Sequence, residues 1–311
     1  MVKVVVDKYI PFLQESLSQY DVLALAPDAI DNASVRDADA LIVRTRTAVT
    51  RQLLEGSSVR FVATATIGTD HLDTEYLDSV GIKWYSSPGC NAQAVCDYVE
   101  EAIAEWLPTT RVKTPTIGII GVGHVGSRVQ EMAHRHGYGV LLNDPPKGLN
   151  TPLRTIAEQA DVITFHTPLE EDTFHLGSRE LFGMCKRRPL IINAARGGVI
   201  DERAAMELGL PYIIDTWEGE PVVDREVLRN AFRASVHIAG YSLQGKVNAT
   251  RQCLDAFSEY FGTEPLLIDP KAVSLRQGMG DTEFGWLERI TERLKQAPDQ
   301  FDQLRKQYKL R

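Results

Sequence analysis

Short apolar runs alternate with segments of helical composition along the first part of the chain. The apolar runs cover residues 2–6, 22–25, 38–45, 59–66 and 82–87, and the helical segments cover 11–20, 50–56 and 71–81. Strands and helices that alternate at such short spacing are typical of a parallel sheet with helices on its faces. The pattern ends at Pro88 and Gly89, so we predict a small α/β unit over residues 1–90.

A second series of elements starts with a long amphipathic segment at 91–107, whose apolar residues recur at three- and four-residue steps. Pro108 and Pro115 then bracket a polar stretch that we interpret as a linker, and a helix is predicted over 247–262. In an open α/β sheet, ligands bind at the carboxyl ends of the strands. Several predicted strands of this second series are followed by polar or glycine residues, and they cover 161–168, 189–195, 211–215 and 235–240.

The segment TIGIIGVGHVGSRV (116–129) is the strongest motif in the chain. An apolar strand runs into Gly121, Gly123 and Gly126, which have the G-x-G-x-x-G spacing, and a segment of helical composition follows. Gly121 permits a tight turn, Gly123 lets the backbone approach a diphosphate, and Gly126 lets the helix pack on the strand. The segment therefore predicts a dinucleotide-binding unit that is inserted after the first α/β unit.

The predicted cofactor contacts extend from these glycines to the start of the helix and to the next strand. His124 and Val125 open the helix, where free N–H groups and the helix dipole favour a negative diphosphate. The next apolar run, VLLND, ends at Asp144. Its carboxylate can accept hydrogen bonds from both ribose hydroxyls and would repel a 2′-phosphate, which favours NAD over NADP.

Length, charge and cysteine usage limit the remaining classes of function. The chain has 311 residues, enough for about two domains. Its formal net charge of −8 disfavours a broad nucleic-acid surface, and no apolar run approaches the length of a membrane span. Cys90, Cys96, Cys185 and Cys253 show no C-x-x-C spacing. We therefore expect a cytoplasmic protein without a disulfide framework, a metal site or a nucleic-acid or membrane partner.

Three charged or titratable residues lie at or near predicted strand ends beyond the glycine motif. Arg196 lies in INAARGGVID, Glu220 in DTWEGEP and His237 in SVHIAGYSLQGK. Taken singly, they could be a surface ion-pair residue, a solvated turn residue and a core histidine with all its hydrogen bonds made. Together, behind a nucleotide motif, they predict hydride transfer between a 2-hydroxy acid and nicotinamide.

The chemistry of that reaction explains why these residue types are needed. The alcohol must lose a proton as the hydride leaves, and histidine can act as the base in one direction and the acid in the other. A neighbouring carboxylate fixes the ring and favours the imidazolium. An arginine fork grips the planar substrate carboxylate through two hydrogen bonds, which lysine cannot reproduce.

The order of the glycine motif, NAARGGVID, DTWEGEP and HIAGYS resembles the D-isomer-specific 2-hydroxyacid dehydrogenases. The segments PGCNA, WEGEP and AGYSLQGK are more specific and are similar to the branch that oxidises 4-phospho-D-erythronate in pyridoxal phosphate biosynthesis. The resemblance runs from residue 1 to about 262, and DQFDQLRKQY (299–308) is similar to the tail of that branch.

The resemblance implies an α/β protein of two Rossmann-like doubly wound parallel-sheet domains, with the NAD domain inserted into a flavodoxin-like substrate domain. We predict residues 1–90 and 263–311 as the discontinuous substrate-binding domain and residues 91–262 as the NAD-binding Rossmann domain. The family usually carries a longer C-terminal dimerisation region, and the short tail leaves the mode of dimerisation open. A homodimer is still expected.

The resemblance also assigns roles to single residues by motif match. Arg196, Glu220 and His237 take the catalytic positions, with His237 as the acid/base. Arg44 is a plausible grip for a 4-phosphate because a charge-assisted fork suits phosphate. Lys246 is a second candidate, or else a solvated lysine. The remaining implied contacts are Asp144, Thr167, Asp215 and Gly240 with NAD, and Thr45, Thr66 and Tyr241 with the substrate.

The implied activity is the NAD-dependent oxidation of 4-phospho-D-erythronate to 2-oxo-3-hydroxy-4-phosphobutanoate. One alternative is a sister dehydrogenase that acts on 3-phosphoglycerate, glyoxylate or hydroxypyruvate. Another is a sensor that binds NAD without catalysis. The complete set of arginine, glutamate and histidine disfavours the sensor, because a pure binding protein could lose it.

Overall fold

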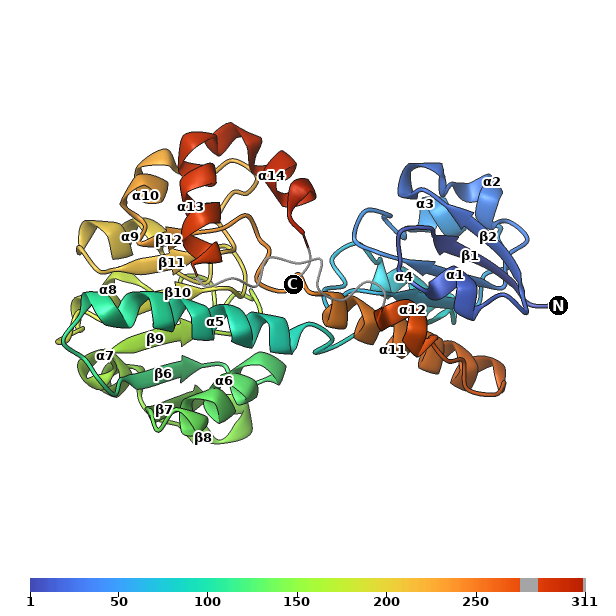
Figure 1. Cartoon of the computed structure of the whole chain (residues 1–311). Helices are drawn as coiled ribbons and strands as arrows, with labels where there is room; N and C mark the ends of the chain where they lie inside the picture. The colour runs from blue at the N-terminus through green and yellow to red at the C-terminus, as the bar shows by residue number, and fades with distance from the viewer. Residues whose placement is uncertain (275–284, 310–311) are drawn as a thin grey trace. The chain divides into compact units, whose positions relative to one another are not determined.

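The computed structural model describes residues 1–274 and 285–309, which form two compact units (Figure 1). The first unit comprises residues 1–91 with helices α11 (Leu243–Phe261) and α12 (Pro270–Ser274), and the second comprises residues 92–241 with α13 (Trp286–Gln296) and α14 (Phe301–Gln307). Each unit is built on its own sheet with helices around it, which confirms the predicted α/β class.

The first unit has a five-stranded parallel sheet in the order β2-β1-β3-β4-β5, which is the flavodoxin-like order. All four residues of β3 and of β4 are buried, because helices cover both faces of the sheet. The strands are β1 (Lys3–Asp7), β2 (Asp21–Leu25), β3 (Ala40–Val43), β4 (Phe61–Thr64) and β5 (Lys83–Tyr85). The short helices are α1 (Leu13–Ser16), α2 (Asn32–Val35), α3 (Arg51–Leu54) and α4 (Thr74–Ser79), with a 3-10 turn η1 (Pro27–Ala29).

Helix α11 belongs to the core of the first unit, so the predicted boundary at residue 262 is wrong. Leu254 and Phe257 of α11 share a buried cluster with Val4 of β1 and Phe61 of β4. The rings of Phe61 and Phe257 meet edge to face, with their centroids 5.8 Å apart. An amphipathic pattern shows that one face of a helix is buried, but it does not show which core receives that face.

The second unit has a seven-stranded sheet in the order β12-β11-β10-β9-β6-β7-β8. Only β8 runs antiparallel to its neighbour, at the edge of the sheet. The strands are β6 (Thr116–Ile120), β7 (Gly139–Asp144), β8 (Leu149–Asn150), β9 (Val162–Phe165), β10 (Leu190–Asn193), β11 (Tyr212–Ile214) and β12 (Arg233–Ala234). The helices are α5 (Ala92–Trp106), α6 (His124–Arg135), α7 (Leu153–Gln159), α8 (Arg179–Gly183), α9 (Glu202–Glu207) and α10 (Arg225–Asn230), with 3-10 turns η2 (Leu107–Thr109) and η3 (Pro145–Lys147).

The strand order reverses at β6, which pairs with β7 on one side and β9 on the other. This is the topological switch point of a doubly wound sheet, and ligands bind outside the carboxyl ends of the strands there. The glycine motif begins directly after β6, so the fold puts it at the expected position.

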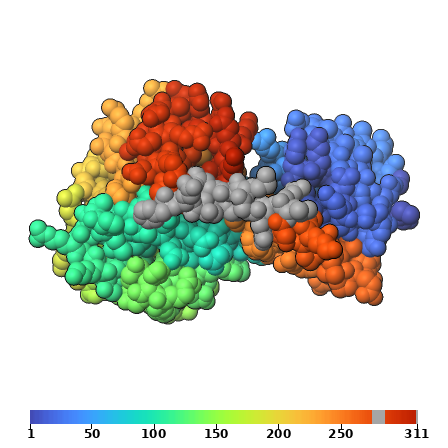
Figure 2. All heavy atoms as spheres, in the orientation of Figure 1, coloured from blue at the N-terminus to red at the C-terminus, as the bar shows by residue number. Residues whose placement is uncertain are grey.

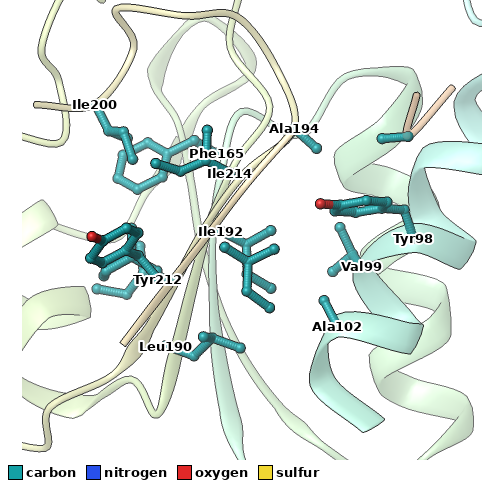
Figure 3. Close-up of a cluster of buried hydrophobic side chains, with 14 of the residues drawn as sticks. Tyr98, Val99, Ala102, Phe165, Leu190, Ile192, Ala194, Ile200, Tyr212 and Ile214 are labelled. Carbon is teal, nitrogen blue, oxygen red and sulfur yellow. The ribbon is translucent and has the colours of Figure 1, made fainter. Parts of the chain in front are cut away.

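Helix α5 covers one face of this sheet (Figure 1). Figure 3 shows Ile192 of β10 directed toward Val99 and Ala102 of α5, while Tyr212 of β11 lies on the opposite side of the sheet. All four side chains are at most 1% exposed. Because both faces are covered, the strands are apolar along their length, and polar residues occur mainly where the strands end.

The C-terminal helices pack on the second unit, which also differs from the predicted division. Trp286, Leu287 and Ile290 of α13 join the buried cluster that contains Tyr98 of α5. Figure 2 shows the red atoms of α13 and α14 against the orange atoms around α10, and the Lys295 ammonium donates to the Ala231 carbonyl at 2.8 Å. The segment that we assigned to the substrate domain therefore contributes to the core of the other unit.

The run 235–240 is not the predicted strand, because β12 ends at Ala234. His237 has φ of 58°, a left-handed backbone conformation that a strand does not contain. The N–H groups of Ile238 and Ala239 bond to the Asp215 carboxylate instead of a neighbouring strand. Among the described residues, no helix is long and apolar enough to cross a membrane.

Candidate active site

The glycine turn after β6 is shaped by close backbone contacts. Gly121 has φ of 85°, and a Cβ there would lie 2.8 Å from the carbonyl carbon of His166. A Cβ on Gly126 would lie 2.0 Å from the carbonyl oxygen of Gly121. A Cβ on Gly123, in contrast, would meet nothing within 4 Å. The first and third glycines are thus required for packing, and the second leaves open space above the turn, which a diphosphate needs.

Helix α6 supplies the donors for that space. It begins at His124 after Gly123, and no side chain in the described part of the chain caps its first turn. The free N–H groups of the first turn and the helix dipole therefore favour a bound anion. His124 is exposed, while Val125 is partly buried against the core of the second unit.

Asp144 lies at the end of β7, next to the glycine turn. Its Oδ2 accepts a hydrogen bond from the Val122 N–H at 2.8 Å, and the Lys147 ammonium donates to the Val122 carbonyl at 2.7 Å. The hydrogen bond from Val122 holds the Asp144 carboxylate in place and leaves lone pairs of the carboxylate for ribose hydroxyls.

Thr167 follows β9 on the other side of the switch point. Its hydroxyl is buried and has no hydrogen-bond partner among the described residues. Buried polar groups are normally paired, so this hydroxyl fits a group of the cofactor. Next to it, burial lowers the pKa of His166 to about 3, so the imidazole is neutral and adds no charge beside Thr167.

We expect Asp144→Asn to bind NAD about 10-fold more weakly and to discriminate less against NADP, because Asn cannot form charge-assisted bonds to the ribose or repel a 2′-phosphate. The asparagine oxygen can still accept from Val122, so the turn is preserved. Fluorescence titration with NADH and NADPH measures both dissociation constants. An unchanged ratio of the two constants would refute the assignment of Asp144 to the ribose.

The His237 imidazole and the Glu220 carboxylate form a direct pair. The distance from His237 Nδ1 to Glu220 Oε1 is 2.5 Å, and both side chains are partly buried. Burial raises the pKa of Glu220, but the hydrogen bond and charge of His237 and the N–H of Trp217 outweigh it, and the net pKa is below the usual value. The carboxylate is therefore ionised and accepts from the Nδ1–H of the ring, which leaves Nε2 as the second functional nitrogen.

The loop 217–221, which carries Glu220, is held by hydrogen bonds to two buried residues, Ser235 and Glu202. The Trp217 side chain is 1% exposed, and its indole N–H donates to the Ser235 carbonyl at 2.8 Å. The backbone N–H of Glu218 donates to the buried carboxyl of Glu202 at 2.8 Å. These contacts fix the position of the carboxylate that orients His237.

Asp215 organises the turn that carries His237. Its buried carboxylate accepts from the Ser235 hydroxyl and the Ile238 N–H, both at 2.7 Å, and from the Ala239 N–H at 2.9 Å. The predicted contact of Asp215 with NAD stays a prediction. Oδ1 already accepts two of these hydrogen bonds, whereas Oδ2 accepts one and keeps a lone pair. Gly240 follows the same turn and is partly exposed.

Arg196 lies just after β10 and is partly buried. The Asn193 amide donates to the carbonyls of Arg196 and Thr216, at 2.9 and 3.3 Å, and so ties the ends of β10 and β11 together. No carboxylate among the described residues pairs with the Arg196 guanidinium, so the ion-pair interpretation has no support. Arg196, Glu220 and His237 thus follow the ends of three adjacent strands, β10, β11 and β12.

Comparison with known proteins places this geometry in a family. Residues 96–239 match the NAD binding domain of the D-isomer specific 2-hydroxyacid dehydrogenases. An erythronate-4-phosphate dehydrogenase of Bacteroides thetaiotaomicron is 41% identical over 99% of this chain and 96% of its own length. One of Cronobacter sakazakii is 37% identical over 99% of this chain and 91% of its own.

The chain belongs to the erythronate-4-phosphate dehydrogenase family. Within the larger D-2-hydroxyacid dehydrogenase family, it is an NAD-dependent oxidoreductase, which confirms the predicted enzyme class and cofactor.

Solved structures of more distant proteins support the fold. The TT0316 protein of Thermus thermophilus superposes with a TM-score of 0.70 at 23% identity, over 85% of this chain and 98% of its own. An NAD-bound 3-phosphoglycerate dehydrogenase of Entamoeba histolytica gives a TM-score of 0.69 at 23% identity, over 86% and 98%.

The predicted substrate residues Arg44, Thr45 and Thr66 lie in the first unit. The Arg44 guanidinium is bonded to the buried carboxylate of Asp7, with Nε to Oδ2 at 2.7 Å and Nη2 to Oδ1 at 3.1 Å. Lys246 is in the same unit, and its pKa is lowered by burial and by the Arg44 charge, against the opposing effect of Asp7. Lys246 is partly buried, so it is not the freely solvated lysine of the alternative interpretation.

Thr66 belongs to a chain of polar side chains at the end of β4. The Thr64 hydroxyl lies 2.7 Å from the Thr66 hydroxyl and 2.9 Å from His71 Nε2, and the Thr66 hydroxyl donates to the Gly68 carbonyl at 3.2 Å. Burial lowers the pKa of His71, so this ring is neutral. Thr45 is exposed, and Tyr241, in the second unit, is partly buried.

Sequence reasoning missed Glu202, because a glutamate in the first turn of a helix is typical of a solvated position. Burial raises the pKa of the Glu202 carboxyl to about 8. The charges of Glu218, Asp224 and Glu220 add to this increase, and the hydrogen bond from the Glu218 N–H opposes it. Glu202 is 5% exposed, so the folded protein keeps this carboxyl protonated at neutral pH.

We expect Glu202→Gln to stabilise the protein increasingly as the pH rises. A carboxyl whose pKa is raised on folding costs stability as the pH increases from about 4.5 to about 8, and the cost then stays constant. Gln keeps an oxygen acceptor for Glu218 but never ionises, so its advantage at pH 9 is on the order of a few kcal/mol. Melting temperatures from pH 5 to 9 measure this, with the exposed Glu207→Gln on the same helix as a control. Parallel melting curves for the variant and the wild type would contradict the prediction.

Proposed function

We propose that this chain oxidises 4-phospho-D-erythronate to 2-oxo-3-hydroxy-4-phosphobutanoate, with NAD as the hydride acceptor. The observation that carries the proposal is the 41% identity, over nearly the full length of both chains, to a protein named erythronate-4-phosphate dehydrogenase. The pairing of His237 with Glu220 at 2.5 Å supports the acid/base chemistry. The phosphate contacts predicted for Arg44 and Lys246 stay predictions, because the Arg44 guanidinium is already paired with the Asp7 carboxylate.

His237 acts as the base that takes the proton of the substrate C2 hydroxyl. Because Nδ1–H donates to the ionised Glu220, the lone pair for this proton is on Nε2. As the ring becomes imidazolium, Glu220 stabilises its charge. Bound NAD supplies the acceptor for the C2 hydride. In the reverse direction, the imidazolium returns its proton to the carbonyl oxygen.

Arg196 binds the substrate carboxylate at C1. Its guanidinium has no carboxylate partner among the described residues, so its fork can form two parallel hydrogen bonds with the acid. This contact places C2 and its hydroxyl beside the imidazole and gives the active site its preference for 2-hydroxy acids. We assign both NAD and the Arg196 contact with the substrate carboxylate to the second unit.

In the second unit, the proposed cofactor residues are Gly121, Gly123, His124, Val125, Gly126, Asp144, Thr167, Asp215 and Gly240. Of the substrate residues, Arg44, Thr45, Thr66 and Lys246 are in the first unit and Tyr241 is in the second.

A substrate panel tests the proposed specificity. The purified protein is assayed for NADH formation with 4-phospho-D-erythronate, 3-phospho-D-glycerate and D-erythronate, and for NADH consumption with glyoxylate and hydroxypyruvate. We expect the highest kcat/KM for 4-phospho-D-erythronate. A clear preference for an unphosphorylated acid would refute the substrate assignment, and tight NAD binding without turnover of any acid would favour the sensor.

We also propose a cytoplasmic homodimer. The four cysteines are free, and only Cys185 is not fully buried, which suits a reducing compartment. The resemblance to a dimeric family supports the assembly. Light scattering of the purified protein tests the dimer, and a mass of one chain, 34.6 kDa, would exclude it.

A further inference from the structure

The C-terminal helix α14 places an arginine beside the candidate active site. Arg305 Nε donates to the Tyr241 hydroxyl at 3.0 Å, and the guanidinium carbon lies 5.6 Å from the centre of the Tyr241 ring. The charge of Arg305 also contributes to the lowered pKa of Glu220. Arg305 is therefore close to both a predicted substrate residue and the carboxylate that orients His237.

The position of Arg305 is fixed by packing. Phe301 and Leu304 of the same helix are 1% and 5% exposed and belong to the core of the second unit. The Tyr308 ring contacts Trp286 of α13, with the ring centroids 6.1 Å apart. The partly buried guanidinium is thus held on an ordered helix, and less of its conformational freedom is lost when it binds a ligand.

The hydrogen-bonding capacity of Arg305 is only partly used. Its Nη1 and Nη2 groups have no hydrogen-bond partner among the described residues, and no carboxylate there forms an ion pair with it. Arg225 on α10, in contrast, is paired with Asp299. A partly buried cation without an anionic partner in the protein is suited to an anionic ligand.

We propose that Arg305, oriented by its hydrogen bond to the Tyr241 hydroxyl, forms a binding subsite for the phosphate of the substrate. This inference rests on the proposed function, in which the substrate carries two anionic groups, and Arg196 binds the carboxylate. The four N–H donors of Nη1 and Nη2 match the tetrahedral oxygens of a phosphate ester.

Arg305→Gln tests the subsite, with Lys306→Gln as the matched control on the exposed side of the same helix. Loss of charge-assisted hydrogen bonds is expected to lower kcat/KM for 4-phospho-D-erythronate by about 100-fold. The kcat/KM for D-erythronate, which lacks the phosphate, should change less than about 3-fold. Equal losses for the two substrates would show that Arg305 acts on the His237–Glu220 pair or on the fold, and would overturn the proposal.

A second readout separates this inference from the substrate assignment. Inorganic phosphate is used as a competitive inhibitor of whichever 2-hydroxy acid the wild type oxidises. We expect its inhibition constant to rise about 10-fold in Arg305→Gln and less in Tyr241→Phe, which keeps the ring and removes the hydroxyl that orients Arg305. An unchanged inhibition constant in Arg305→Gln overturns the subsite whatever the natural substrate is. The melting temperature of each variant shows that α14 remains docked.

Discussion

His237→Asn is expected to lower kcat about 1,000-fold while the affinity for NAD stays within about 2-fold. Asparagine is the appropriate replacement, because it tolerates the φ of 58° at this position and removes the base. NAD affinity is preserved because none of the cofactor contacts that we propose comes from the His237 side chain. Steady-state kinetics give kcat, and fluorescence titration gives the dissociation constant for NADH.

The same unit contains a well-matched control. His175 also has a left-handed backbone, with φ of 48°, and its Nε2 lies 2.9 Å from the carboxylate of Glu218. His175→Asn therefore removes a histidine–glutamate pair of similar geometry that takes no part in the proposed chemistry, and we expect kcat to change less than about 3-fold. Similar losses in both variants, or a parallel loss of NAD affinity in His237→Asn, would mean that His237 is not the acid/base.

The sequence predicts the parts of this protein that depend on local patterns. The strand, turn and helix of the glycine motif follow from a short apolar run and from Gly121 and Gly126, whose close contacts exclude a side chain. The reversal of strand order at β6 agrees with the doubly wound sheet that the resemblance implies. His237 and Glu220 are 17 residues apart in sequence and were grouped by chemistry and motif, and the structure brings them within 2.5 Å.

Other features depend on contacts that no local pattern contains. The amphipathic faces of α11 and α13 predict burial but not the unit on which each helix packs. The turn after β12 is held by the carboxylate of Asp215, which is distant in sequence. The apolar residues of this turn alone therefore predict a strand. The roles proposed for Glu202 and Arg305 arise from their surroundings, since both residues are typical of solvated helix positions in sequence.

Arg196→Lys is the second variant with a large expected effect, because it keeps the charge and removes the fork. A lysine ammonium cannot form two parallel hydrogen bonds with a carboxylate, so we expect kcat/KM for the hydroxy acid to fall about 100-fold. Both a higher KM and a lower kcat should contribute, since the same contact binds the acid and aligns C2. NAD affinity should remain within about 2-fold.

Arg187→Lys provides the comparison at the opposite end of β10, where an exposed arginine is paired with Asp161 at 3.4 Å. A surface pair of this kind contributes little, so its kinetic constants should match those of the wild type. If Arg196→Lys behaved in the same way, the guanidinium would not bind the substrate carboxylate. The preference for 2-hydroxy acids would then have to come from residues outside β10 and its following turn.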